Sequence, residues 1–339
     1  MNRFKMNSRF TTLFLVALAV VIIFAAACQQ QPPKPAVPPQ KVTIAYPTTM
    51  LSILTHIAFE KGYFLAEGLA VTPQLHGFGK PALQSVLAGK ADLALSADTP
   101  VMFAVAGGNK IHIVAMVGIS RKAIAVVARK DRGISIPAEL KGKKIGVTLG
   151  TTGDFYLDSF LSVRGIDKKN VKILDMKPGE MPDALAKGSV DAVSIWNPTL
   201  KQIERALKVD GVSFYDEHLY SDLACLSAQQ DFVVKNPETI RKILKALLRA
   251  ETFVKLNPTE AKRMIAELTA TDPSLIEELW SPYDFRVALT QSLLVSLEDQ
   301  TRWAIKNRLT QRKDMPNYLD FIYVEGLKAV KPDAVRIIR

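Results

Sequence analysis

Two threonine pairs stand where a loop could bind a small polar ligand. Thr151 and Thr152 lie in the run Gly150–Asp154, which follows an apolar stretch and precedes a stretch of helical periodicity. The first amides of a helix have no partner within the helix and lie at the positive end of its dipole, so they favour an acidic group. Thr48 and Thr49 follow an earlier apolar stretch in the same way. Both pairs are equally compatible with ordinary capping loops.

Polar residues at the end of another apolar run could complete such a site. Ser96 ends the run 93–96, and Asp98 and Thr99 follow it. A carboxylate at Asp98 would accept hydrogen bonds from an ammonium or a ring N–H of a ligand. The alternative is that Asp98 caps a helix that begins near Pro100.

Three further residues occupy comparable places. Trp196 and Asn197 end a matching apolar run later in the chain, and Ser120 lies just beyond a third run. Tryptophan at the end of a strand can form a flat wall for an apolar or aromatic ligand. It can equally belong to the core, and the sequence leaves that choice open.

Signatures of catalysis and of metal binding do not occur in the sequence. There is no H-E-x-x-H, G-x-S-x-G, P-loop or paired C-x-x-C pattern, and the histidines are scattered. The run 77–82 imitates a dinucleotide fingerprint, but the helix it would open is short. Cys225 is the single cysteine of the folded part, which is typical of buried filler. We therefore expect no metal, no cofactor and no enzymatic activity.

A basic cluster near the C-terminus is the remaining charged feature. Its spacing predicts a solvated helix face, and we expect no nucleic-acid partner. The cluster comprises Arg302, Lys306, Arg308, Arg312 and Lys313.

The elements that must position these residues alternate between strands and helices. Short Val- and Ile-rich runs bounded by Gly, Pro, Asp or Thr predict buried strands, with helical periodicity between most of them. These runs are 42–46, 93–96, 111–117, 123–128, 144–149 and 191–196. This alternation favours α/β layers with largely parallel sheets. The C-terminal third is predicted to be mostly helical, because Asn236, Asn257 and Asp272 each precede a proline that can begin a helix.

An internal repeat relates two halves of the α/β region. A shift of about 100 residues superimposes the two threonine pairs and the glycines that end the following helices, Gly62 and Gly165. The same shift brings together two glycine turns that lead into strands, at 88–92 and 187–191. Any two α/β units look alike to some degree. Two such lobes face to face would form a cleft where loops after the strands converge.

The first 27 residues have the pattern of a signal peptide. Arg3, Lys5 and Arg9 precede an uncharged apolar run over 10–27, which ends at Cys28. Cleavage there would leave 312 residues, enough for two domains, and would lower the formal net charge from +11 to +8. With 48% hydrophobic and 23% charged residues, the chain is an ordinary globular protein rather than a disordered or collagen-like one. An uncleaved membrane anchor is the alternative, because the run could just span a bilayer.

The residues around Cys28 predict a lipid anchor followed by a spacer. The run 24–28 resembles the lipobox of bacterial lipoproteins, in which the cysteine is acylated and becomes the first residue, although Ala25 stands where leucine or a branched residue is more usual. Five prolines between 29 and 40 prevent a helix or a sheet. We expect residues 28–40 to form an extended tether and the folded body to begin near Lys41.

Four motifs, in order along the body, resemble the solute-binding proteins of ABC importers for nitrate, sulfonate, taurine, bicarbonate and thiamine precursors. They are Ile57–Leu69 (IAFEKGYFLAEGL), Leu140–Val147 (LKGKKIGV), the pattern from Ala184 to Pro198 that ends in WNP, and Pro316–Tyr323 (PNYLDFIY). The resemblance covers about residues 41–335. It implies an α/β, two-lobed periplasmic-binding-protein fold with two crossover strands (type II) and a helical C-terminal part. Residues 41–131 and 231–339 would form the first lobe, and residues 132–230 the second.

The resemblance also implies partners and a site. A monomeric, extracytoplasmic protein, held to a membrane by lipid on Cys28, would close on a small molecule and deliver it to an ABC permease and its ATPase. The implied ligand positions are Thr48, Thr49, Ser96, Asp98, Thr99, Ser120, Thr151, Thr152, Trp196 and Asn197. Because Asp98 stands where oxyanion binders have small or neutral residues, and no arginine occupies these positions, we expect an organic solute with a polar nitrogen and an acidic or aromatic part. A sensor subunit for a membrane signalling protein, and an enzyme like the thiamine-pyrimidine synthases, are the alternatives.

Overall fold

The computed structural model describes residues 38–338. The expected signal peptide, Cys28 and most of the tether therefore lie outside the described residues. The last tether residue, Gln40, already belongs to the first strand. Within residues 38–338, none of the helices is both long and apolar enough to cross a bilayer.

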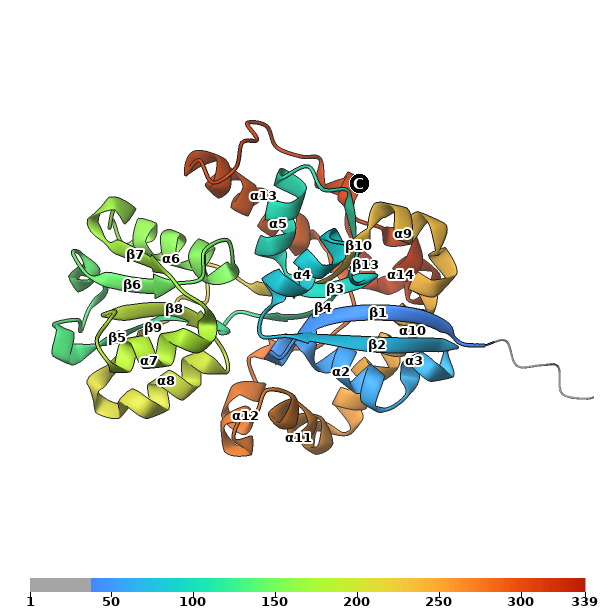
Figure 1. Cartoon of the computed structure of the whole chain (residues 1–339), viewed down its shortest axis with the longest axis horizontal. Coiled ribbons are helices and arrows are strands. Elements are labelled where there is room, and N and C mark those ends of the chain that lie inside the picture. The colour runs from blue at the N-terminus through green and yellow to red at the C-terminus, as the bar shows by residue number, and fades with distance from the viewer. Residues whose placement is uncertain (1–37, 339) are drawn as a thin grey trace, which may run out of the picture. The chain divides into compact units, whose positions relative to one another are not determined.

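The first lobe is built on a six-stranded sheet with the order β11-β4-β10-β3-β1-β2 (Figure 1). Its strands are β1 (Gln40–Pro47), β2 (Leu69–His76), β3 (Leu93–Ala97), β4 (Ile111–Ser120), β10 (Asp222–Gln229) and β11 (Tyr283–Asp284). β2, β1 and β3 are parallel, whereas β10 runs antiparallel to β3 and β4. The helices that follow these strands are α2 (Ile53–Glu60), α3 (Tyr63–Ala66), α4 (Gly79–Leu87) and α5 (Asp98–Ala106), with the short 3-10 helix η1 (Met50–Ser52) before α2.

The second lobe is built on a five-stranded sheet with the order β7-β6-β8-β5-β9. Its strands are β5 (Ile124–Arg129), β6 (Lys144–Val147), β7 (Lys172–Asp175), β8 (Ala192–Trp196) and β9 (Gly211–Phe214). Its helices are α6 (Thr152–Val163), α7 (Met181–Ala186) and α8 (Thr199–Leu207). β7, β6 and β8 are parallel, and β5 runs antiparallel to β8 and β9.

The chain crosses between the lobes twice, at positions that differ from the expected bounds. β4 of the first sheet passes into β5 of the second over residues 121–123, and β9 passes back into β10 over residues 215–221. The expected bounds, 131 and 230, lie about one strand further along. Each crossing strand enters the other sheet antiparallel to its neighbour, so neither sheet is parallel throughout. Apolar content alone does not reveal which sheet a strand joins or in which direction it runs. This explains why the lobe bounds and the strand directions differ from those predicted.

The internal repeat is confirmed by the backbone. The backbone amide of Thr43 in β1 donates to the Asp92 carboxylate at 2.7 Å, and that of Lys144 in β6 donates to the Asp191 carboxylate at 2.9 Å. Gly62 and Gly165 both adopt positive φ where a helix ends. Apart from β11, which has no counterpart, the two sheet orders also correspond strand for strand, with the incoming crossover strand beside β3 in one lobe and beside β8 in the other.

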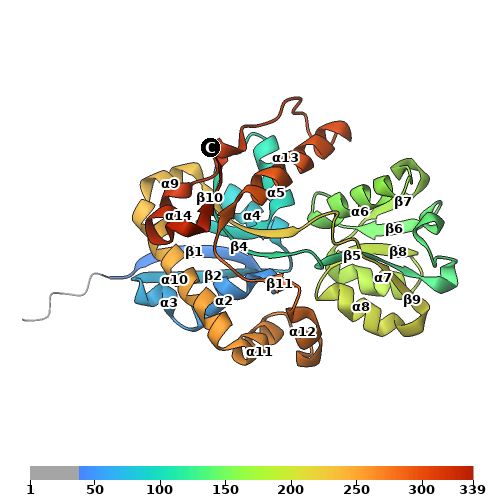
Figure 2. The same ribbon diagram turned by 180° about the vertical axis from the view of Figure 1, so that it is seen from behind.

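The C-terminal third returns to the first lobe and is mainly helical, as predicted (Figure 2). Its helices are α9 (Gln230–Lys235), α10 (Pro237–Leu256), α11 (Pro258–Leu268), α12 (Pro273–Trp280), α13 (Gln291–Lys306) and α14 (Val324–Val330); a small sheet joins β12 (Leu289–Thr290) to β13 (Val335–Arg336). Prolines occupy the first positions of α10, α11 and α12, and the Asp272 side chain caps α12 by accepting from Ser274 N. In the long helix α10, Ile240, Ile243, Leu244 and Leu247 are buried, so this face packs into the core.

Candidate functional site

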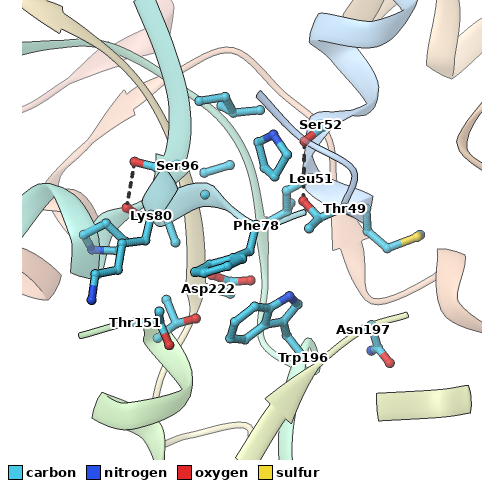
Figure 3. A pocket seen from close by; sticks show the side chains of 18 of the residues that line it. Thr49, Leu51, Ser52, Phe78, Lys80, Ser96, Thr151, Trp196, Asn197 and Asp222 are labelled. Atoms are coloured by element: carbon cyan, nitrogen blue, oxygen red, sulfur yellow. Dashed lines mark hydrogen bonds between the residues drawn. The ribbon is translucent and has the colours of Figure 1, made fainter. Parts of the chain in front are cut away.

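A cleft lies between the two lobes and is lined by residues from both (Figure 3). The empty space between its walls is about 570 Å³, including space open to solvent. The lining residues come from β1–η1, from the loop into α4, from β3–α5, from the start of α6, from the end of β8 and from β10–β11. They are Pro47, Thr49, Met50, Leu51, Ser52, Phe78, Gly79, Lys80, Leu95, Ser96, Ala97, Pro100, Thr151, Thr152, Trp196, Asn197, Asp222, Ala224 and Tyr283.

Six of the ten predicted positions meet in this cleft. Thr49 and Ser96 come from the first lobe, and Thr151, Thr152, Trp196 and Asn197 come from the second. The repeat explains the pairing, because Thr49 and Thr151 each precede a helix after equivalent strands. Thr151 Oγ1 donates to Thr148 O at 2.7 Å, which fixes the loop before α6. Because Thr151 and Thr152 line the cleft, the N-terminus of α6 lies at it. The free backbone amides there can attract an acceptor group of a ligand.

The remaining four predicted positions lie outside the cleft lining. Thr48 is half-buried, and its backbone amide donates to His76 O at 2.9 Å. Ser120 is buried beside the first crossing, where its hydroxyl accepts from Lys122 N at 3.2 Å. Asp98 and Thr99 are buried at the start of α5. These residues shape the walls behind the cleft.

Asp98 is held by the protein itself. Its carboxylate accepts hydrogen bonds from Ser296 Oγ at 2.6 Å, from Gln300 Nε2 at 2.7 Å and from the Tyr220 hydroxyl. Thr99 N donates to it as well, at 3.0 Å. Burial raises the pKa of Asp98 to about 6, and these hydrogen bonds limit the rise. The expected contact between Asp98 and a ligand nitrogen thus finds no support in this geometry.

Asp222 is the carboxylate that does line the cleft, and sequence reasoning missed it. It begins β10, and its Oδ1 atom is buried without a hydrogen-bond partner. Burial raises the pKa of Asp222 to about 8, and the neighbouring charge of Asp98 adds to that rise. No local pattern marks this residue, because its place depends on antiparallel pairing of β10 with strands more than one hundred residues away.

The loop before α4 supplies a wall that sequence reasoning had set aside. Phe78 faces Trp196 across the cleft, with ring centroids 6.4 Å apart and planes inclined by 42°. Gly79 is required for this approach, since a Cβ there would lie 2.9 Å from Ser96 Cα. The ammonium of Lys80 donates to Leu149 O at 2.8 Å and so links the first lobe to the second. The run that imitates a dinucleotide fingerprint is thus part of a different site.

The lobes also touch on both flanks of the cleft. On one flank, Arg205 of α8 pairs with Glu278 of α12 at 2.5 Å. On the other, the indole N–H of Trp303 in α13 donates to Asp158 of α6, and the Trp303 ring packs edge-on against Phe155. This structure therefore has a closed cleft.

The site offers binding groups and little that could hold a metal. Among residues 38–338, no three His, Cys, Asp or Glu side chains converge as metal ligands would. Cys225 is fully buried in β10, and burial raises the pKa of its thiol well above the usual value. The arrangement of hydroxyls, aromatic rings and helix amides suits reversible binding of a small solute.

Comparison with known proteins identifies the family. Residues 52–261, more than half of the chain, match the family model described as NMT1/THI5 like. The chain belongs to the NMT1/THI5-like family. A protein of Brucella abortus (strain 2308), named for binding without a stated ligand, is 29% identical over 232 residues, which cover 66% of this chain and 70% of that one. The taurine-binding periplasmic protein of Escherichia coli (strain K12) is 24% identical over 64% of this chain and 67% of its own.

A solved structure extends the likeness to the whole body. The alkanesulfonate-binding protein SsuA from Xanthomonas axonopodis pv. citri, bound to MOPS, matches with a TM-score of 0.72 at 19% identity, covering 85% of this chain and 100% of that one. At this identity the likeness shows the fold alone. The family resemblance and the two-lobed periplasmic-binding-protein fold predicted from the sequence are confirmed.

Proposed function

We propose that this member of the NMT1/THI5-like family is the extracytoplasmic solute-binding subunit of an ABC importer. It would capture a small organic solute between its lobes and deliver it to a membrane permease driven by an ATPase. The observation that carries the proposal is a cleft lined by loops from both lobes, in which six of the predicted ligand positions meet. A solute that touches both lobes favours the closed form through contacts that exist only there.

The proposed ligand residues are the six predicted positions that meet in the cleft, together with Phe78 and Asp222. The amides at the start of α6 and the hydroxyls of Thr151 and Thr152 would receive an acidic or polar acceptor group. Phe78 and Trp196 would hold an apolar or aromatic part. This combination supports a sulfonate-like or nitrogen-containing organic solute.

The proposed location depends on residues outside the described part of the chain. Acylation of Cys28 would hold the body on a membrane through residues 28–40, as a monomer facing the periplasm or the cell exterior. Expression of the full chain and its Cys28→Ser variant tests this. The native chain should fractionate with membranes and the variant with the soluble extract.

Two alternatives remain distinguishable by experiment. A sensor subunit would bind the same solute, but deleting the protein would leave uptake of that solute intact. A synthase-like enzyme would consume the solute, whereas a binding subunit returns it unchanged. The ammonium of Lys80, the lysine in the cleft, is engaged in a hydrogen bond to Leu149 O. This favours a binding role for the protein over a catalytic one.

A thermal-shift screen of the body, residues 41–339, tests the proposed function. The panel contains nitrate, bicarbonate, taurine, alkanesulfonates, aromatic sulfonates, thiamine pyrimidines and riboflavin. A ligand at one hundred times its dissociation constant should stabilise the fold by about 2.7 kcal/mol and raise the melting temperature by several degrees. A panel without any shift would contradict the proposal for these solute classes.

A further inference from the structure

The cleft contains two acceptor oxygens that the protein leaves unsatisfied. Asp222 Oδ1 and Asn197 Oδ1 are both buried and have no hydrogen-bond partner, and both residues line the cleft. The amide of Asn197 is oriented by its other end, since Nδ2 donates to Lys122 O at 3.3 Å. Buried acceptors without partners are costly, so they mark places where a ligand or water completes the bonding.

The two charged side chains that line the cleft differ in how free they are to contact a ligand. Asp222 and Lys80 are the charged side chains among the lining residues. Lys80 is bound to the Leu149 carbonyl, while one oxygen of Asp222 remains free. Figure 3 draws the Asp222 carboxylate among the lining side chains and the Lys80 ammonium at the edge of the group. The charge-bearing group of the cleft that is free to meet a ligand is therefore the Asp222 carboxyl.

The aromatic lining suits the same kind of ligand. The faces of tryptophan, tyrosine and phenylalanine attract cations, and tryptophan does so most strongly. Phe78, Trp196 and Tyr283 all line the cleft beside Asp222. Tyr283 and Asp222 are brought together by the first sheet, because both pair with Ser120 in neighbouring strands.

From these observations we infer that the cleft selects a solute with a protonated nitrogen that carries at least two N–H donors. One donor is accepted by Asp222 Oδ1 and one by Asn197 Oδ1, while Phe78 and Trp196 enclose the adjoining part of the solute. The inference rests on the proposed function and specifies its ligand. It implies that a sulfonate without an amine is a poor ligand, because it leaves both acceptors unpaired beside a carboxylate.

Matched pairs of solutes test the inference by isothermal titration calorimetry on the body. Taurine is compared with ethanesulfonate, and 4-(aminomethyl)benzenesulfonate with 4-methylbenzenesulfonate. The amino member of at least one pair should bind about tenfold or more tightly than its partner, as expected for a buried charge-assisted hydrogen bond. Asp222→Asn and Asn197→Ala should each reduce this ratio to about threefold or less. The control variant Asp183→Asn, which changes an exposed carboxylate in α7, should leave the ratio unchanged.

The outcomes separate the inference from the proposed function. If both members of a pair bind equally, or if Asp222→Asn keeps the full advantage of the amine, the inference is overturned while solute binding stands. If Asp222→Asn improves binding of the amine-free sulfonates, Asp222 excludes anions, which supports the inference. If neither member of either pair binds the wild-type body, the inference fails for these solutes, and the thermal-shift panel decides separately whether the proposed function stands. Melting curves of each variant verify that it folds.

Discussion

Asp98 and Asp222 are two buried carboxyl groups that the protein treats differently. Asp98 receives hydrogen bonds from four neighbours, whereas Asp222 keeps one oxygen without a partner. Burial raises the pKa of both, to about 6 for Asp98 and about 8 for Asp222. The better-satisfied group is suited to hold the start of α5 in place. The less satisfied group is suited to meet a ligand.

Asp222→Asn should stabilise the ligand-free body at alkaline pH. A carboxyl whose folded pKa lies above its unfolded value of about 3.9 favours folding when protonated, and this contribution is lost as the pH rises toward the folded value. Burial and the neighbouring charge of Asp98 oppose the ionisation of Asp222. The melting temperature of the variant relative to wild type should therefore increase between pH 5 and pH 9. A difference that does not change with pH would contradict the raised pKa.

Binding of an amine to Asp222 should strengthen as the pH rises, whereas binding of an anion at the same place should weaken. A cation stabilises the ionised carboxylate, so the complex releases a proton whenever the free protein has Asp222 protonated. Affinity for the amino solute that binds should rise between pH 6 and pH 8 and level off above the pKa of Asp222. Calorimetry in two buffers with different ionisation enthalpies should detect the released proton at pH 7. No release, or proton uptake, would mean that Asp222 does not pair with the amine.

Trp196 should report solute binding through its fluorescence. It lines the cleft, whereas Trp280 packs against Phe285 and below Lys262. A saturating solute should change the emission of the wild-type body, and Trp196→Phe should remove more than about half of that change. Trp280→Phe is the matched control and should retain it. An unchanged response in Trp196→Phe would place the solute elsewhere.

At the scale of elements, closure depends on contacts between helices of opposite lobes. Both side chains of the ion pair between Arg205 and Glu278 are exposed. The pair should therefore contribute little to the stability of the closed form, as surface ion pairs do. The bond from Trp303 to Asp158 is more protected, because the Trp303 side chain is largely buried and packs against Phe155. We therefore expect the flank between α6 and α13 to stabilise the closed form more than the flank between α8 and α12.

Trp303→Phe should weaken solute binding without unfolding either lobe. The phenylalanine keeps much of the ring packing and removes the donor to Asp158, so the closed form loses stability relative to an open one. We expect affinity to fall by roughly three- to tenfold. Arg205→Ala on the other flank should change it by less than about twofold. Equal effects of the two variants would refute the unequal roles of the flanks.

The sequence predicted those elements whose cause is local and missed those that depend on distant pairing. The strands before the threonine pairs and the proline-initiated helices follow from periodicity and capping residues, and the repeat located Thr49 and Thr151 in one cleft. Asp222 could not be predicted, because β10 mixes small and polar residues and its environment comes from β3 and β4. Asp98 was misplaced for the same reason. Its position after β3 is local, but Ser296 and Gln300 reach it from α13.

At the scale of the molecule, the two crossings at 121–123 and 215–221 join the lobes, and we expect the lobes to move about them. Because the closed form depends on contacts between the lobes, the ligand-free body should open in solution. Small-angle X-ray scattering should then give a larger radius of gyration without solute than with it, and the saturated body should match the present structure. Identical scattering in both states would mean that binding does not involve closure.

If a solute binds in the cleft between the lobes, calorimetric titration should distinguish two variants at adjacent positions, one inside the cleft and one outside it. Thr49 lines the cleft and Thr48 does not, although both are half-buried. With the solute of largest thermal shift, wild type and Thr48→Trp should bind with similar affinity. Thr49→Trp should fill the cleft and lose about tenfold or more in affinity while melting near wild type. Undiminished binding by Thr49→Trp would place the solute outside this cleft.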